Sequence, residues 1–212
     1  MSNSPAMITA KALGAMPAFA MAEMGEKKTL GLLSQVGLAE QFIEDRHGYI
    51  TEHALCEFVR GISQALGEDR LGLLFSPYLT VADYGAWGRY VLSAPDLETA
   101  LLRAQREMGL HSNTDRVEFE CRGNMVTYTY KFGHKHHVSY PDMAYSAVAA
   151  MMSIPRAYLG QGWSPTKIEC DFPSERGSAH AQETFGCQVL FNRAQLRLVF
   201  PSSDLGARRS KL

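Results

Sequence analysis

The chain has 212 residues, 46% of them hydrophobic and 20% charged, with a formal net charge of −1. That much apolar sequence is enough for one sizeable core, and it excludes the disordered class, in which low hydrophobicity accompanies high net charge. Because the opposite charges balance, nothing in the composition favours direct binding to nucleic acid or to anionic lipid.

Residues 1–25 contain an apolar run rich in alanine and methionine, which is similar to a signal peptide in composition. No basic cluster precedes this run and Lys11 lies inside it, whereas a secretory signal has its positive charge ahead of the apolar segment. We therefore expect a flexible N-terminal tail on a cytoplasmic protein. No later run is long and apolar enough to span a bilayer, so no membrane association is expected.

A regular helical pattern appears first between Thr51 and Gly67. The threonine is a favourable N-cap and the glycine a favourable end, so the pattern predicts an amphipathic helix between them. Its apolar residues recur at spacings of three and four: Leu55, Phe58, Val59, Ile62 and Leu66.

A second helical region, residues 84–109, is interrupted by Pro95. The residue before a proline is disfavoured in the helical conformation, so the pattern predicts two helices rather than one. The second is expected to begin after Asp96, which can cap it.

From residue 116 the apolar pattern changes from a helical to an alternating period. Val117, Phe119 and Cys121 alternate with charged residues, and a second alternating run covers residues 125–132. Gly123-Asn124 between the runs suits a two-residue turn with positive φ. The stretch therefore predicts an antiparallel hairpin with one apolar face.

The rest of the chain predicts a long helix from about Pro141 to Leu159. A strand over 166–172, a short helix around 179–185 and one or two strands between 188 and 200 complete the series. The order of helices, hairpin, helix, strand, helix and strands predicts the α+β class. We expect a single domain in which helices cover an antiparallel sheet that includes the hairpin.

A search for catalytic and metal-binding motifs finds none of the common ones. The histidines of the "GHKHH" segment, residues 133–137, have no cysteine or carboxylate nearby in sequence, so a polar loop is favoured over a zinc site. The cysteines are isolated, which suits a reducing compartment: Cys56, Cys121, Cys170 and Cys187. We accordingly predict no enzymatic activity, no metal and no cofactor.

Four segments of the chain resemble the successive blocks of a known family. They read "DYGAWGRYVLSAPDLETALLRA", "YLGQGWSPTKIECDFP", "ETFGCQVLFNRAQLRLVF" and "SSDL". In this order they are similar to the N-terminal sensory domain of AraC/XylS-type transcription regulators, in the subgroup labelled arabinose-binding-like. The resemblance runs from about Gly31 to Leu205, and it departs from the family around Gln195, where an asparagine is usual.

The resemblance implies an effector-sensing and dimerisation domain over residues 26–205, with a small-molecule effector and a second copy of the chain as partners. In the family a pair of helix-turn-helix motifs normally follows. Residues 206–212 are too few for one such motif, so we expect them to be a linker or a truncated end. Binding to DNA is then expected only through a C-terminal module that is absent from this sequence.

The Met-rich stripe of the predicted 141–159 helix is the candidate surface for self-association. A helix with more apolar surface than one sheet contact covers is a natural dimerisation element. Packing of the whole stripe into the core is the alternative, since methionine is a common core residue. The stripe consists of Met143, Val148, Met151, Met152 and Ile154.

Aromatic and imidazole side chains are unusually dense around the hairpin and its flanking helices, as in the walls of a small-molecule pocket. The aromatic rings could instead fill the core between sheet and helices. The cationic candidates could pair with an acidic group on the ligand or lie in solvent. The candidate ligand-binding residues are Trp87, Arg89, Tyr90, His111, Tyr128 and Tyr130.

Two other functions stay open at this point. A haem or metal sensor is one alternative, because gas-sensing domains also have an α+β fold, although no histidine has a clear apolar helical setting. A small uncharacterised enzyme is the other, although no nucleophile and base stand together in a recognisable motif.

Overall fold

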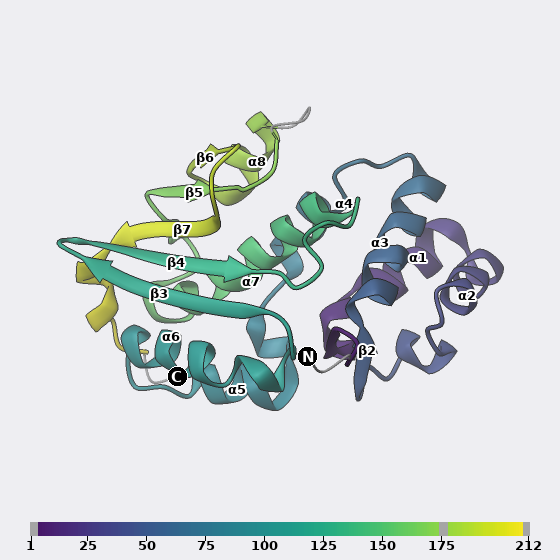
Figure 1. Ribbon diagram of the computed structural model, residues 1–212, viewed down its shortest axis with the longest axis horizontal. Coiled ribbons are helices and arrows are strands. Elements are labelled where there is room, and N and C mark those ends of the chain that lie inside the picture. Colours follow the sequence, from purple (N-terminus) through teal and green to yellow (C-terminus); the bar gives the residue numbers. More distant parts are fainter. Residues whose placement is uncertain (1–3, 174–177, 210–212) are drawn as a thin grey trace.

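The computed structural model of the protein describes residues 4–173 and 178–209 (Figure 1). The helices are α1 (Met16–Met24), α2 (Glu26–Gln35), α3 (Glu52–Leu66), α4 (Leu71–Phe75), α5 (Gly85–Leu92), α6 (Leu97–Arg106), α7 (Tyr140–Leu159) and α8 (Ser178–Phe185). The strands are β1 (Met7–Thr9), β2 (Tyr49–Thr51), β3 (Arg116–Arg122), β4 (Met125–Lys131), β5 (Lys167–Glu169), β6 (Gln188–Leu190) and β7 (Leu196–Pro201). The chain is an α+β domain, as predicted.

The larger sheet has the order β3-β4-β7-β5-β6 within the described residues. The predicted hairpin is confirmed, with Val117 opposite Tyr130, and β7 pairs antiparallel with β4. One pair departs from the predicted antiparallel sheet, because β5 and β6 are parallel. The reason lies in their connection, since α8 separates the two strands and allows the chain to return in the same direction.

The two faces of this sheet differ in polarity. On one face, Val126 and Tyr128 of β4 are fully buried beneath the helices, and α6 and α7 lie on this side (Figure 1). On the other face, charged side chains pair across the strands, as Lys131 does with Glu118 at 2.8 Å. The sheet therefore has one covered and one solvated face, which explains the alternating sequence pattern.

The helix boundaries follow the capping residues of the sequence. The Thr51 side chain accepts a hydrogen bond from the Ala54 N–H at 3.1 Å, and Gly67 ends α3 in the left-handed conformation. Asp96 caps α6 by accepting from the Thr99 N–H at 2.8 Å. The predicted break between α5 and α6 is thereby confirmed.

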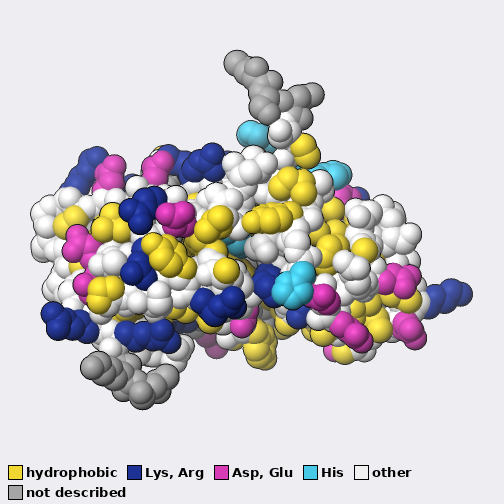
Figure 2. All heavy atoms as spheres, turned by 90° about the horizontal axis from the view of Figure 1, so that it is seen from below, with side chains coloured by type: hydrophobic (Ala, Val, Ile, Leu, Met, Phe, Trp, Pro, Cys, Tyr) yellow, Lys and Arg dark blue, Asp and Glu magenta, His cyan; other side chains and the backbone are white. Residues whose placement is uncertain are grey.

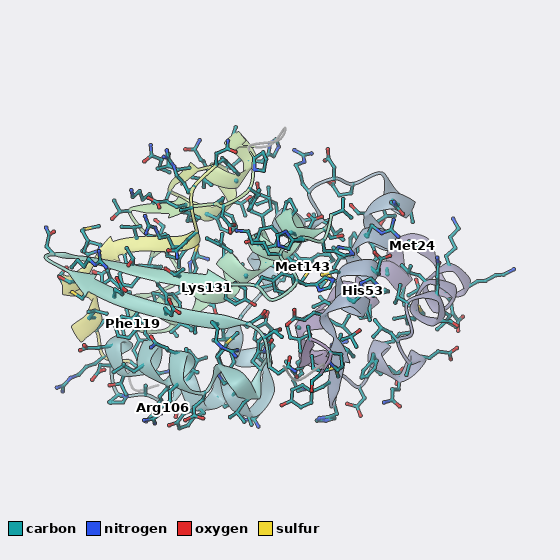
Figure 3. The ribbon with its side chains drawn as sticks, viewed as in Figure 1. Met24, His53, Arg106, Phe119, Lys131 and Met143 are labelled. Carbon is teal, nitrogen blue, oxygen red and sulfur yellow. The ribbon has the colours of Figure 1, made fainter. Side chains whose placement is uncertain are left out.

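The long helix α7 is the centre of the core. Its Met-rich stripe is buried throughout, so the predicted use of this stripe for self-association is wrong. The physical reason is that α7 contacts helices on several sides as well as β7, so little of its apolar surface stays open. In Figure 3, Met143 lies near the middle of the molecule, between the sheet and α3.

Residues 4–25, which belong to the predicted flexible tail, contain a strand and helices. Strand β1 pairs antiparallel with β2, with Ile8 opposite Ile50, and α1 follows after a short 3-10 helix. Ala10, Leu13 and Ala20 are fully buried. These side chains are small or spaced irregularly, so they produce no clear periodicity although they pack closely. Residues 1–3, also included in the predicted tail, lie outside the described residues.

The last described residues pack against the body of the domain. The Leu97 N–H donates to the Ala207 carbonyl at 3.0 Å, and the backbones of Asp96 and Arg208 form an isolated antiparallel β-bridge. The Arg209 guanidinium donates to the Leu92 carbonyl at 2.8 Å. The segment predicted as a linker is thus held against α5 and α6 up to Arg209, and its residues 210–212 lie outside the described part.

Candidate functional site

A largely apolar cavity lies between the covered face of the sheet, α5, α7 and the N-terminal segment. The volume of the cavity is about 50 Å³, and the space widens toward its open mouth. This volume is below the roughly 300–1,000 Å³ of most small-molecule sites, so a ligand can enter only if the surrounding side chains move apart. The lining residues are Ile8, Ala12, Met16, Val81, Tyr84, Trp87, Met108, His111, Val117, Tyr128, Tyr130, Phe132, Met143, Ser146, Ala147, Ala150, Met151 and Ile154.

Three stacked rings form one wall of the cavity. The His111 imidazole lies 4.7 Å from the Tyr84 ring and 5.1 Å from the Trp87 ring, measured between centroids. The planes are tilted by 18° and 27° respectively. The first turn of α5 positions Trp87, Tyr84 immediately precedes that helix, and His111 follows the short 3-10 helix after α6. The sequence separates these side chains by 27 residues at most, and the fold stacks them.

Two ring nitrogens of this wall have no hydrogen-bond partner among the described residues. They are Trp87 Nε1 and His111 Nδ1, and both are fully buried. Buried polar atoms without a partner are uncommon, because each loses the hydrogen bond that water would have made. Burial also lowers the pKa of His111 from 6.5 to about 4, so the imidazole is neutral at pH 7.

On the sheet side, the cavity is lined by aromatic residues, and one of them makes a hydrogen bond to a polar group that lies outside the lining. Tyr128 and Tyr130 of β4 both line the space. The Tyr130 hydroxyl donates to a carboxylate oxygen of Asp115, whose other oxygen accepts from the Gly133 N–H at 2.8 Å. Tyr130 is thereby fixed between the cavity and a buried polar network.

That network contains a second buried acid, Glu52 at the start of α3. One of its oxygens accepts from the hydroxyls of Ser112 and Thr114, and the other has no partner within the described chain. Burial and the neighbouring Glu52 charge raise the pKa of Asp115 well above its usual range. The network joins α3 to the segment that precedes β3.

Four of the six predicted ligand residues lie together in this lining: Trp87, His111, Tyr128 and Tyr130. Arg89 and Tyr90 do not, since both are exposed on the outer side of α5. Tyr90 packs instead beneath the Arg103 guanidinium, which lies 4.7 Å from its ring centroid. Successive residues of a helix point in directions about 100° apart, so Trp87 inside the cavity places Arg89 and Tyr90 elsewhere.

This arrangement changes the expected ligand chemistry. The sequence suggested that Arg89 or His111 would pair with an acidic ligand, yet Arg89 is outside the cavity and His111 is neutral at pH 7. No Lys or Arg belongs to the lining formed by the described residues. The cavity therefore lacks the cation that a carboxylate would need.

Several lining residues were missed by sequence reasoning. Tyr84 lies three residues before Trp87, and that helical spacing could have placed it on the same wall. Ile8, Ala12 and Met16 carried no such signal, because they belong to the segment interpreted as a tail.

The histidines of the 133–137 segment lie in the turn between β4 and α7. The rings of His134 and His137 approach that of His53, and His137 Nε2 lies 2.8 Å from a Glu57 oxygen. Within residues 4–173 and 178–209, no group of three or more His, Cys, Asp or Glu side chains is placed to hold a metal ion. None of the helices in the same ranges is both long and apolar enough to cross a membrane.

The family described as the N-terminal arabinose-binding domain of AraC transcription regulator matches residues 28–208. The chain belongs to this family. The match confirms the resemblance seen in the four sequence blocks and spans the described cavity apart from its N-terminal wall.

A solved structure similar to this family member is the transcriptional regulator CdpR from Pseudomonas aeruginosa, with a TM-score of 0.61 and 16% sequence identity. The similarity covers 87% of this chain and 56% of that chain, so this chain spans little more than half of the regulator's length. At this identity the likeness supports the fold. No curated protein matches the chain by sequence.

Proposed function

We propose that the chain is the effector-sensing and dimerisation domain of an AraC-type transcription regulator, acting in the bacterial cytoplasm on an attached DNA-binding module. Membership of the family supports the regulatory role. The observation that carries the sensing role is the apolar cavity with its stacked rings and unpaired nitrogens. Such a lining offers area for an apolar ligand and a few groups that orient it.

The position of the cavity suggests how a bound ligand would change the arrangement of the elements at the end of the domain. Its walls come from the N-terminal segment, α5, β4 and α7, which are distant in sequence. A ligand that contacts all four favours the arrangement in which they surround it, by as much as its affinities for two arrangements differ. The segment after β7 packs on α5 and α6, so that a change in α5 reaches the end of the domain.

A thermal-unfolding screen with small neutral and acidic aromatic metabolites tests the sensing role. A true effector stabilises the fold by about 2.7 kcal/mol at a hundredfold excess over its dissociation constant. Ala147 lines the cavity on α7, so Ala147→Phe should fill the space and abolish the response. Ala86 is exposed on α5, and Ala86→Phe is the matched control that should retain it. A hit that survives Ala147→Phe would place the site elsewhere.

Dimerisation needs a surface other than the buried α7 stripe. Leu102 of α6 is 50% exposed and Tyr90 of α5 is 38% exposed. Figure 2 shows this side of the molecule, where Lys and Arg side chains lie among scattered hydrophobic ones over α5 and α6. We assign self-association to this α5–α6 surface.

Light scattering at high micromolar concentration should give the mass of a dimer. Leu102→Glu should return the monomer mass, because a charge buried at an interface loses its hydration. Leu74→Glu is the control, since Leu74 is 45% exposed on α4, away from α5 and α6. A monomeric wild type, or an equal effect of both variants, would contradict this part of the proposal.

A further inference from the structure

The chemistry of the cavity wall specifies a class of ligand more narrowly than the proposed function does. Trp87 Nε1 can only donate a hydrogen bond, and it has no acceptor among the described residues. Trp87 is 5% exposed to solvent, and its side chain lines the cavity. A ligand that supplies an acceptor there satisfies a group that the protein leaves unsatisfied.

His111 Nδ1 provides a second polar contact on the adjacent ring. The imidazole is neutral at pH 7, so Nδ1 either accepts or donates according to its tautomer. Its Tyr84 and Trp87 neighbours are stacked on it and leave Nδ1 without a partner in the described chain. A ligand hydroxyl can pair with Nδ1 in either tautomer, whereas a carbonyl oxygen can only accept from Nδ1 when that atom carries the proton.

The remaining lining residues disfavour a ligand that carries a negative charge. The methionines, valines and isoleucines around the rings offer no compensation for an anion, and the lining contains no Lys or Arg among the described residues. Transfer of an unpaired carboxylate into such a site costs several kcal/mol. The two carboxyl groups behind Tyr130, those of Asp115 and Glu52, carry no positive charge that could compensate an anionic ligand.

We propose that the cavity selects a neutral, mostly apolar small molecule carrying a carbonyl or hydroxyl oxygen that accepts the hydrogen bond of the Trp87 indole. This inference rests on the proposed function, because it defines the effector class for the same cavity.

Three nearly isosteric probes test the class: acetophenone carries the carbonyl, ethylbenzene lacks it and benzoate is anionic. Dissociation constants for the full chain at pH 7.5 follow from ¹H–¹⁵N spectra of the two tryptophan indole groups. Trp163 is an internal control, because its Nε1 already donates to Asp204 at 2.9 Å. Acetophenone should move the Trp87 indole proton downfield and leave that of Trp163 in place, and it should bind about tenfold or more tightly than benzoate.

The contribution of the hydrogen bond is isolated by Trp87→Phe, which removes the donor and retains an aromatic ring. The preference for acetophenone over ethylbenzene should fall about tenfold in Trp87→Phe, and Trp163→Phe should leave it unchanged. Comparing the ratio of the two probes cancels their different hydration and any general loss of stability in the variant.

The outcomes separate this inference from the proposed function. Binding of all three probes with an unchanged preference in Trp87→Phe, or tightest binding of benzoate, contradicts the ligand class and leaves the sensing cavity in place. If none of the probes perturbs the Trp87 signal at millimolar concentration, both the ligand class and the sensing cavity are contradicted.

Discussion

Burial sets the charge of His111 in the cavity wall and of Asp115 behind that wall, and it acts on the two side chains in opposite directions. His111 is disfavoured as a cation, which lowers its pKa to about 4, whereas Asp115 is disfavoured as an anion, which raises its pKa. Both groups are therefore more neutral in the folded protein than in the unfolded chain. The stability of the domain should depend on pH through each of them.

For His111 the unfolded pKa is about 6.5 and the folded one about 4, so the folded state binds fewer protons in that interval. The contribution of neutral His111 to the free energy of unfolding is then fully present above pH 6.5 and is lost as the pH falls toward 4. Between pH 7 and 4.5 the wild type should lose about 2 kcal/mol more free energy of unfolding than His111→Phe. Urea denaturation at the two pH values measures this difference. Parallel losses in both proteins would show that His111 is not buried in its neutral form.

For Asp115 the sign is reversed, because the folded pKa lies above the unfolded one and the folded state binds more protons between them. The free energy of unfolding should fall as the pH rises from 4 toward 8. Asp115→Asn keeps the shape without the charge. As the pH rises across this range, the free energy of unfolding of the variant should therefore increase by on the order of 2 kcal/mol relative to that of the wild type. Asp83→Asn changes an exposed carboxylate and should show no such trend. An equal pH profile for Asp115→Asn and the wild type would contradict the assignment.

At the scale of elements, the position of α5 decides the geometry of the aromatic wall. Gly88 faces the preceding 3-10 turn so closely that a Cβ there would lie 1.6 Å from the Val81 carbonyl oxygen. The absence of a side chain thus allows α5 to lie against this turn. From that position the helix places Trp87 in the cavity, beside Tyr84 and His111.

Gly88→Ala should therefore force α5 away from the turn and lower the free energy of unfolding by about 3 kcal/mol. Gly31→Ala is the matched control, because Gly31 lies in α2 and a Cβ there meets nothing within 4 Å. That control should be neutral or stabilising by up to about 1 kcal/mol, as expected from helix propensity. Urea denaturation of both variants makes the comparison, and equal effects would argue against the close approach of α5.

At the scale of the whole molecule, β1 joins the N-terminal helices to the sheet. The Thr9 N–H donates to the His111 carbonyl at 2.8 Å, and the Asn113 N–H donates to the Met7 carbonyl at 3.1 Å. On its other side β1 pairs with β2, immediately before α3. This three-residue strand thereby links the N-terminal helices α1–α3, on the right of Figure 1, to the part of the chain that contains the larger sheet, and its Ile8 lines the cavity.

Ile8→Ala should test this connection, since Ile8 is 3% exposed and lines the cavity. Removal of its buried methyl and methylene groups should lower the free energy of unfolding by about 2–4 kcal/mol. Val138→Ala removes apolar atoms at a position that is 74% exposed, and its effect should stay within about 0.5 kcal/mol. A small effect of Ile8→Ala in thermal or urea unfolding would mean that β1 does not hold the two parts together.

The sequence by itself determined the elements with strong local signals. The Thr51 cap, the alternating residues of the hairpin and the Asp96 cap each depend on neighbours within a few positions, so α3, β3, β4 and α6 could be predicted closely. The ordered family blocks were also contained in the sequence, and they identified the family. Trp87, His111, Tyr128 and Tyr130 could be proposed together because aromatic residues gather in that region.

Only the tertiary structure decided which of these residues meet. Arg89 and Tyr90 belong to the same helix as Trp87, and the direction in which α5 packs, allowed by Gly88, leaves them in solvent. The ordering of β1 depends on hydrogen bonds to residues more than 100 positions away, as between Met7 and Asn113, which no local pattern reveals. The neutral state of His111 likewise comes from burial by Tyr84, Trp87 and the rest of the cavity wall, since removal of a charge from water depends on the complete enclosure.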